Sequence, residues 1–314
     1  MKEITVDVII PVYRPGERFG ELLKRLDAQT QPVNRYIIMN TEQAYWDRWL
    51  SETGYSLPEN LSVFHVTRET FDHGATRDAG IRQSDAGICV CMTDDALPAD
   101  QYLLENLVRG LTEKEGTAVA YGRQLPDRDC GIIERYTRAF NYPEESRLKT
   151  REDLPELGIK TYFCSNVCAA YKRSVYLELG GFTKKTIFNE DMIFAAQAME
   201  RGYGVFYSAG ARVIHSHNYN CTQQFKRNFD LAVSQTMHPE IFGGIRSESE
   251  GIRLVKRSLS YCIKIRKPWL MIQVVTQSAG KLLGYKLGQR YERLPRKLVL
   301  ACTMNREFWD KEEL

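Results

Sequence analysis

Four apolar, β-branched runs lie in the first hundred residues, and each of them ends in polar side chains. They cover residues 4–13, 35–42, 61–67 and 86–98, and residues 16–30 carry apolar side chains at helical spacing. Strands that alternate with helices favour a mostly parallel sheet with helices on both faces. We therefore predict an α/β fold whose ligand crevice lies at the carboxyl ends of its strands.

The polar residues at the strand ends are candidates for one binding site. Proline cannot donate a hydrogen bond to a neighbouring strand, so Pro11 is expected to end the first strand. The polar residues that follow the strands are Tyr13, Asn40, Glu42, the cluster from Arg68 to Arg77, and the pair Asp94 and Asp95. The first strand is followed by neither GxGxxG nor GxxxxGK[ST], which argues against a dinucleotide-binding fingerprint and a P-loop.

Several motifs give the chain a resemblance to a known family. The opening VIIPVYRPGERFGELLKRLDAQT resembles that of the nucleotide-sugar-dependent glycosyltransferases of the large inverting GT-A class. The combination of FDHGATRDAG, MTDDALP, NEDMIFAAQAMERGY and VIHSHNY is similar to bacterial rhamnosyltransferases of that class. The likeness covers roughly residues 4–220 by motif and is looser in the tail.

The resemblance implies the GT-A (nucleotide-diphospho-sugar transferase) fold and a division of the chain. Residues 1–242 would form the catalytic domain, with a donor half over about 1–125 and an acceptor half over about 126–242. Residues 243–314 would form a basic, amphipathic helical appendage.

The implied reaction is transfer of L-rhamnose from dTDP-L-rhamnose, with inversion, to a hydroxyl of a cell-surface polysaccharide or lipid-linked oligosaccharide precursor. One alternative is the same fold with a UDP-hexose donor. Another is a non-catalytic member that binds glycans or acts as a scaffold in a polysaccharide assembly complex.

A divalent metal is implied for the donor diphosphate. Asp95 is the expected ligand, and Thr93 stands where the family usually has the first residue of Asp-x-Asp. His215 and His217 are two residues apart in an apparent strand, which puts both imidazoles on one face. Either of them could complete the coordination shell of the metal or donate a hydrogen bond to a phosphate. Oxygen ligands and phosphate favour Mg²⁺ or Mn²⁺.

The cluster FDHGATRD has a donor-site interpretation and a structural one. Gly74 allows close backbone approach, Arg77 offers a planar fork for phosphate, and His73 would line the sugar diphosphate. Asp72 would accept a hydrogen bond from the nucleotide base or fix the position of Arg77. Alternatively, Asp72 caps the helix and Arg77 pairs with Asp78 or Asp94.

The predicted donor-binding residues are Pro11, Tyr13, Asn40, Glu42, Arg68, Asp72, His73, Gly74, Arg77 and Asp94.

Glu190 and Asp191 begin a segment, 190–203, that is typical of an amphipathic helix. Acidic residues at such a position are usually caps of the helix dipole. The resemblance instead implies that Asp191 is the base of an inverting displacement, with Glu190 orienting the base or the acceptor. Ser165 and Asn166 lie in a stretch expected to form the floor of the site, where they would bind acceptor hydroxyls.

The chain has a net charge of +3, but its basic residues gather near the C-terminus. Residues 246–297 hold thirteen Lys and Arg against three Asp and Glu, whereas residues 1–245 have a net charge of −5. This segment fits either a helix in an anionic membrane interface or a helix packed on the catalytic domain with its cations outward. An acidic body without a recognition motif argues against nucleic acid.

The sequence also predicts where the protein works. The N-terminus lacks the pattern of a signal peptide, and eight scattered cysteines are typical of reduced thiols. We expect a cytoplasmic protein, peripheral on the inner face of the cell membrane.

Overall fold

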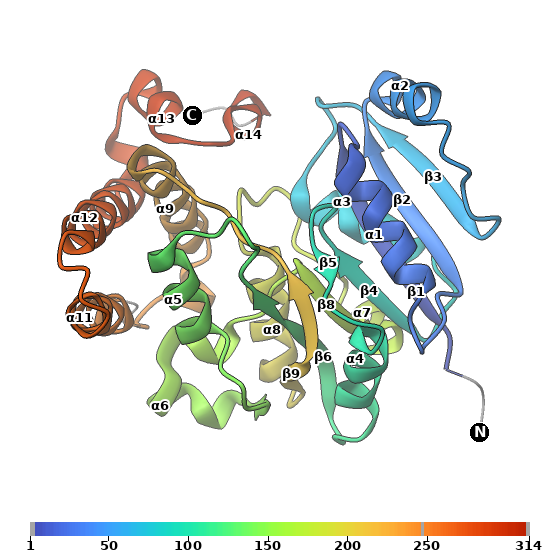
Figure 1. Ribbon diagram of the computed structural model, residues 1–314, viewed down its shortest axis with the longest axis horizontal. Coiled ribbons are helices and arrows are strands. Elements are labelled where there is room, and N and C mark those ends of the chain that lie inside the picture. The colour runs from blue at the N-terminus through green and yellow to red at the C-terminus, as the bar shows by residue number, and fades with distance from the viewer. Residues whose placement is uncertain (1–3, 246–247, 312–314) are drawn as a thin grey trace.

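The computed structural model describes residues 4–245 and 248–311, and within them the strands form one nine-stranded sheet (Figure 1). The order is β3-β2-β1-β4-β8-β6-β9-β5, and β7 pairs with β9. Six of these strands (β3, β2, β1, β4, β6 and β9) run in the same direction. The predicted α/β fold with a mostly parallel sheet is confirmed.

The strands are β1 (Val6–Tyr13), β2 (Arg35–Thr41), β3 (Leu61–Val66), β4 (Ile88–Met92), β5 (Leu97–Pro98), β6 (Thr117–Leu125), β7 (Arg147–Lys149), β8 (Cys168–Lys172) and β9 (Gly204–Ile214). The helices up to the end of β9 are α1 (Glu17–Asp27), α2 (Gln43–Thr53), α3 (His73–Arg82), α4 (Leu103–Thr112), α5 (Ile132–Asn141), η1 (Arg151–Asp153), α6 (Leu154–Leu157), η2 (Gly158–Tyr162), α7 (Arg173–Glu178) and α8 (Glu190–Glu200). The later helices are α9 (Cys221–Met237), α10 (Pro239–Phe242), α11 (Glu248–Lys264), α12 (Leu270–Gly288), η3 (Tyr291–Arg293), α13 (Arg296–Cys302) and α14 (Arg306–Lys311).

The first strand is longer than the sequence predicts. It passes through Pro11 and pairs with β2 as far as Tyr13, so the expected stop at the proline is wrong. The ladder between β1 and β4 ends at Ile9. Pro11 therefore lies where β1 has a paired strand on one side only, a position at which a missing N–H is tolerated.

Two helices show how burial shapes the core. The apolar face of α1 is buried as predicted, through Phe19, Leu22, Leu23 and Leu26. Helix α8 was expected to be amphipathic, but eight of its eleven residues are buried, Glu190 among them. A helix buried almost all round places any carboxylate it carries inside the protein.

Glycines hold the C-terminal helices close to α9. Gly280, Gly284 and Gly288 lie four residues apart on α12, and therefore on one face of it. A Cβ at Gly284 would lie 2.1 Å from the carbonyl oxygen of Phe225, and one at Gly288 would lie 2.4 Å from that of Phe229. The two helices approach at a distance that only glycine permits.

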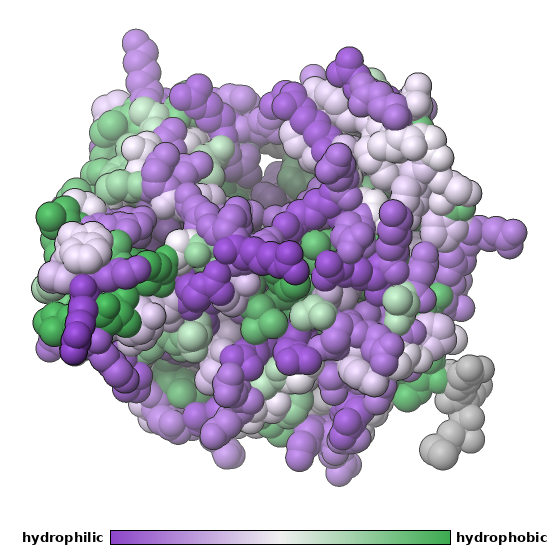
Figure 2. Space-filling view, in the orientation of Figure 1, coloured by the Kyte–Doolittle hydropathy of each residue, from purple (hydrophilic) through white to green (hydrophobic). Residues whose placement is uncertain are grey.

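Helix α12 also leaves large apolar side chains in solvent. Trp269 is 62% exposed, Ile272 70% and Leu283 60%. Figure 2 shows hydrophobic surface gathered on the side where Figure 1 places α11 and α12. Glycine thus forms the face of α12 that packs against α9, and several large apolar side chains of α12 remain outside. Among the described residues, none of the helices combines the length and hydropathy needed to cross a bilayer.

Helix α14 connects the C-terminal helices with the first half of the sheet. Helix α14 packs through Phe308 and Trp309 against α9, and Glu307 forms an ion pair with Arg68, which follows β3. Residues 1–3, 246–247 and 312–314, which include both chain ends and the start of the basic segment, lie outside the described residues.

Candidate active site

A cavity of about 1720 Å³ opens beside the carboxyl ends of β4, β6 and β9 and extends to α11 and α12. It is larger than a typical site for one small molecule, which measures roughly 300–1,000 Å³. Ten residues predicted for the site line it: His73, Arg77, Asp94, Asp95, Ser165, Asn166, Glu190, Asp191, His215 and His217. Residues from distant parts of the sequence therefore face one space.

Asp95, His215 and His217 converge at one end of this cavity. The Nε2 atoms of His215 and His217 each lie 3.6 Å from a carboxylate oxygen of Asp95. One ligand atom from each of the three residues fits within a mutual distance of 4.8 Å. One carboxylate and two imidazoles form a donor set that suits Mn²⁺.

The side chains around His215 fix the direction of its free ring nitrogen. Two hydrogen bonds set the orientation of the Gln124 amide: Arg138 donates to its Oε1, and its Nε2 donates to the hydroxyl of Ser165. His215 Nδ1, 3.1 Å away, must then donate to the same Oε1. Burial lowers the pKa of His215, so its ring is neutral at neutral pH. The lone pair on Nε2 faces Asp95, an arrangement that fits a bridging cation.

Arg18 holds together the loops that carry these candidate metal ligands. Its guanidinium donates to the carbonyl oxygen of Asp95 at 2.7 Å and to that of Ile214 at 3.2 Å. It also forms an ion pair of 2.7 Å with Asp127. One side chain thus fixes both the turn after β4 and the end of β9.

Asp191 is a buried carboxyl at the N-terminus of α8. Its Oδ2 accepts from the backbone N–H of Asn166 at 2.8 Å, and its Oδ1 accepts from that of Met192 at 2.8 Å. Burial, and then the charge of Glu190, raise the pKa of Asp191 to about 7. A carboxyl with a pKa near the working pH is suited to accept a proton.

Glu190 is the opposite case, a buried carboxylate that keeps its charge. It forms an ion pair of 3.2 Å with Arg77 and accepts from Asn166 Nδ2 at 3.1 Å. Burial alone would raise the pKa of Glu190, but Arg77 and then His73 lower it below its ordinary value. The two neighbouring carboxyls therefore have pKa values that are moved apart, a pattern associated with acid–base sites.

The motif FDHGATRD has mainly internal partners. Asp72 caps α3, accepting from the N–H of Ala75 at 2.6 Å, which is the structural alternative. A Cβ at Gly74 would lie 2.1 Å from the carbonyl oxygen of Thr183, so the close backbone approach at Gly74 is made to Thr183. Arg77 pairs with Glu190, whereas the structural alternative had named Asp78 or Asp94.

Asp94 and Thr93 lie at the cavity next to Asp95. Burial, and then the charge of Asp95, raise the pKa of Asp94 to about 6, and the backbone N–H of Tyr13 lies 3.5 Å from its Oδ2. The hydroxyl of Thr93 is buried and has no hydrogen-bond partner among the described residues. His73 also lines the cavity, and desolvation lowers its pKa.

The other seven predicted site residues do not line the cavity: Pro11, Tyr13, Asn40, Glu42, Arg68, Asp72 and Gly74. Three of them form a group at the ends of β1–β3. Glu42 accepts from the backbone N–H of Arg68 at 2.6 Å, and the Arg68 guanidinium lies 5.9 Å from the ring of Tyr13. Asn40 is buried and donates to the carbonyl of Glu42 at 3.1 Å. We call Tyr13, Glu42 and Arg68 the donor edge.

Sequence reasoning missed Arg18, Gln124 and Arg138. Gln124 is the penultimate residue of β6, a strand that the sequence analysis did not single out. Its polar side chain at a strand end was a usable signal. The contacts of Arg18 join segments far apart in the chain and leave no local pattern.

Comparison with known proteins decides the family. The profile of glycosyl transferase family 2 matches residues 7–180, which is more than half of the chain. The chain belongs to glycosyl transferase family 2.

The likeness to two curated proteins extends over nearly the whole length. The chain is 36% identical to the O-antigen chain rhamnosyltransferase RfbN of Salmonella typhimurium, covering 97% of this chain and 96% of that protein. It is 35% identical to the O-antigen chain rhamnosyltransferase WbaN of Salmonella anatum, covering 96% and 95%.

A solved structure supports the fold. The mannosyltransferase PcManGT of Pyrobaculum calidifontis, determined with GDP-Man and Mn²⁺, matches with a TM-score of 0.56 over 99% of this chain and 89% of that one. The sequence identity is 17%, so this likeness concerns the GT-A fold alone.

Proposed function

We propose that this protein is an inverting rhamnosyltransferase that moves L-rhamnose from dTDP-L-rhamnose to a hydroxyl of a cell-surface polysaccharide precursor. The observation that carries the proposal is one cavity that holds both a carboxyl with a raised pKa, Asp191, and a cluster suited to a divalent cation. The choice of rhamnose follows the two O-antigen relatives.

Asp191 acts as the base in this proposal. Its carboxylate takes the proton of the acceptor hydroxyl, whose oxygen forms the new bond to the anomeric carbon while the nucleoside diphosphate leaves from the opposite side. Burial, and then the charge of Glu190, which stays ionised against Arg77, keep the pKa of Asp191 near neutrality. Ser165 and Asn166 line the cavity near this carboxyl and would orient the acceptor.

Asp95, His215 and His217 would hold Mg²⁺ or Mn²⁺ together with the donor diphosphate. When bound, the ion supplies positive charge that stabilises the leaving group. The donor edge would contact the nucleoside, since it lies where β1 brings Tyr13 toward Asp94.

We further propose that the acceptor is linked to a lipid and that the enzyme works at the inner face of the cell membrane. Helices α11 and α12 expose Ile263, Trp269, Ile272 and Leu283 in a segment with an excess of basic residues. Apolar side chains enter the interface, while cations are attracted to anionic lipid headgroups.

Donor profiling tests the activity. The full-length protein is incubated with dTDP-rhamnose, UDP-glucose, UDP-galactose and GDP-mannose, with and without a chelator, and the released nucleotide is measured. Release from dTDP-rhamnose that stops with chelator supports the proposal. A preference for a UDP-hexose overturns the donor, and glycan binding without transfer from any donor favours a scaffold.

A further inference from the structure

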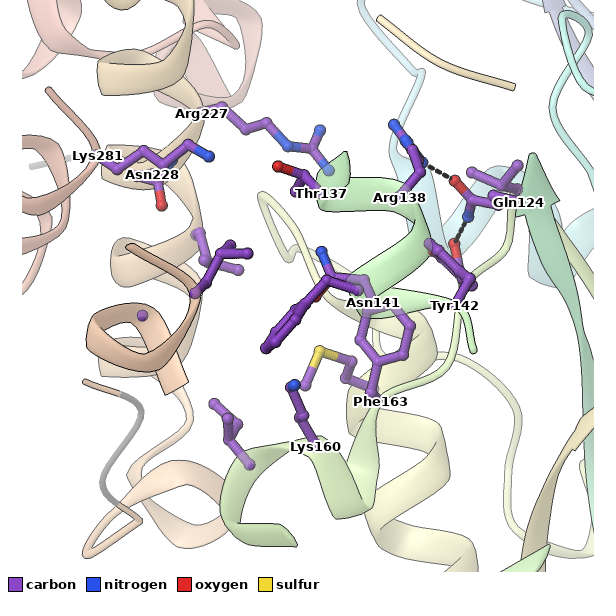
Figure 3. A pocket seen from close by; sticks show the side chains of 18 of the residues that line it. Gln124, Thr137, Arg138, Asn141, Tyr142, Lys160, Phe163, Arg227, Asn228 and Lys281 are labelled. Atoms are coloured by element: carbon purple, nitrogen blue, oxygen red, sulfur yellow. Dashed lines mark hydrogen bonds between the residues drawn. The ribbon is translucent and has the colours of Figure 1, made fainter. Parts of the chain in front are cut away.

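Two cations face the cavity from the wall that α9 and α12 form. Arg227 on α9 and Lys281 on α12 line it, and Figure 3 shows both side chains reaching toward α5, which carries Thr137 and Arg138. This wall lies on the acceptor side of the sheet, away from the donor edge at β1–β3 (Figure 1). The mechanism above gives neither residue a role.

The positions of the two cations are fixed by the packing of their helices. Gly280 precedes Lys281 directly, and a Cβ there would lie 2.8 Å from the Sγ of Cys221. Gly284 lies against Phe225, two residues before Arg227. Because α12 cannot slide or rotate without losing these contacts, Lys281 is held beside α9 and next to the cavity.

Among the described residues, neither cation has an acidic partner in an ion pair. There, Lys281 forms no ion pair or hydrogen bond, and the guanidinium of Arg227 lies over the rings of Phe188 and Tyr219, at 4.8 and 5.9 Å. The nearby carboxylate of Glu134 is bound to Arg138 at 2.7 Å. This wall therefore presents more positive than negative charge to the cavity.

The electrostatics of Lys281 agree with this geometry. Desolvation lowers the pKa of its ammonium group, and Arg227 and Arg138 lower it further against the opposing effect of Glu134. A partly buried ammonium group is costly without a counter-ion, and an anion bound between the helices would offset that cost.

Apolar side chains adjoin the two cations. Val255 of α11 and Val274, Val275 and Leu282 of α12 line the same cavity, and Val275 and Leu282 are also exposed at the surface. The wall thus offers positive charge together with apolar side chains, two of which are exposed at the surface proposed to meet the membrane. A ligand with an anionic group attached to a hydrocarbon chain matches this combination of charge and apolar surface.

We propose that Arg227 and Lys281 form a second anion subsite that binds the phosphate of the lipid-linked acceptor, separate from the site of the donor diphosphate. The apolar residues of α11 and α12 take the first part of the lipid chain. The proposal rests on the proposed function for the identity of its ligand. It names residues that would govern recognition of the acceptor and not of the donor.

The test is a binding measurement that needs neither donor nor turnover. A short-chain alkyl diphosphate is titrated calorimetrically, without divalent cation, into wild type, Arg227→Gln, Lys281→Gln and the control Lys264→Gln. Lys264 is an exposed cation on α11 that does not line the cavity. We expect affinity to fall about tenfold in each of the first two variants, because a charge-assisted hydrogen bond is lost, and to stay unchanged in the control. Lys281→Arg should restore most of it.

Three results would overturn the proposal. The first is unchanged alkyl diphosphate binding in both variants, once thermal unfolding shows that they are folded. The second is an equal loss of affinity for a nucleoside diphosphate with Mn²⁺, which would assign the cations to the donor. The third is inorganic pyrophosphate binding as tightly as the alkyl diphosphate, which would make the ligand a free anion. A failure of the rhamnose assignment changes none of these readouts.

Discussion

Arg77 on α3 and Glu190 on α8 form an ion pair of 3.2 Å in which the two side chains are only 7% and 9% exposed. The pair joins two of the motifs that the sequence analysis treated separately. It keeps a negative charge next to Asp191, and that charge is the second cause, after burial, of the raised pKa of Asp191. In the proposed mechanism, the ion pair therefore helps to set the pKa of the base.

Glu190→Gln should move the pH profile of the reaction. In wild type, kcat/KM for the acceptor should rise with pH through about 7, because Asp191 must lose its proton to act as a base. Removing the neighbouring negative charge lowers the pKa of Asp191, so the rise should occur at lower pH. Carboxyl NMR of Asp191 gives the same midpoint where turnover is too slow. An unchanged or higher midpoint would contradict this role of Glu190.

Asp191→Asn should reduce kcat by about 10²–10⁴-fold, the usual contribution of a general base. The amide keeps the shape of the side chain, so nucleotide affinity and thermal stability should change little. Asp85→Asn, at an exposed aspartate before β4, is the matched control and should retain full activity. Transfer at the wild-type rate by Asp191→Asn would rule out Asp191 as the base.

Gln124→Leu should weaken binding of Mn²⁺ by about 10- to 100-fold, the usual effect of losing a partner that orients a metal ligand. The leucine cannot accept from His215 Nδ1, so the ring loses the contact that directs Nε2 toward Asp95. Electron paramagnetic resonance of free Mn²⁺ measures the affinity. Gln43→Leu, at an exposed position on α2, should leave it unchanged. Equal affinity in both variants would remove Gln124 from the metal site.

Gly284→Ala should destabilise the protein by about 1–3 kcal/mol through overpacking, because its Cβ would lie 2.1 Å from the carbonyl of Phe225. Gly251→Ala, on α11, meets no atom within 4 Å and should be neutral or stabilise by up to about 1 kcal/mol. Urea unfolding of both variants provides the comparison. If Gly284→Ala costs as little stability as Gly251→Ala, then α9 and α12 can separate at little cost.

Trp269→Ser combined with Ile272→Ser should reduce sedimentation of the protein with anionic vesicles several-fold. Both side chains are exposed on or next to α12, and their apolar area contributes to interfacial binding. Tyr102→Ser, at an exposed aromatic residue next to α4, should have no effect. Equal loss in this control would show that the contact with vesicles is not specific to α12.

Much of the fold could be predicted from short-range pattern. The β-branched runs around Val8, Ile37 and Val90 are the buried strands β1, β2 and β4, and the helical spacing of Leu22 and Leu26 gives α1. Parallel strands bring their carboxyl ends to one edge, so the approach of Tyr13 to Asp94 also followed from topology. These features depend on local sequence and on one rule of sheet geometry.

Other features depend on contacts that local pattern does not report. The partner of Arg77 is set by how α8 packs against α3, and neither interpretation of the cluster had named Glu190 as that partner. The glycines at 280, 284 and 288 carried a readable spacing that the sequence analysis passed over. The roles assigned to the site residues and the domain boundary at 242 stay predictions.

Glu307, close to the end of the chain, reaches Arg68 at the donor edge. The appendage is therefore in contact with the part of the protein proposed to hold the nucleoside. A deletion that removes everything after Phe242 takes away a partner of Arg68 together with the apolar surface of α12. Such a shortened protein would combine a defect in membrane contact with one in nucleotide affinity. Point substitutions on α12 change the membrane contact alone and are therefore easier to interpret.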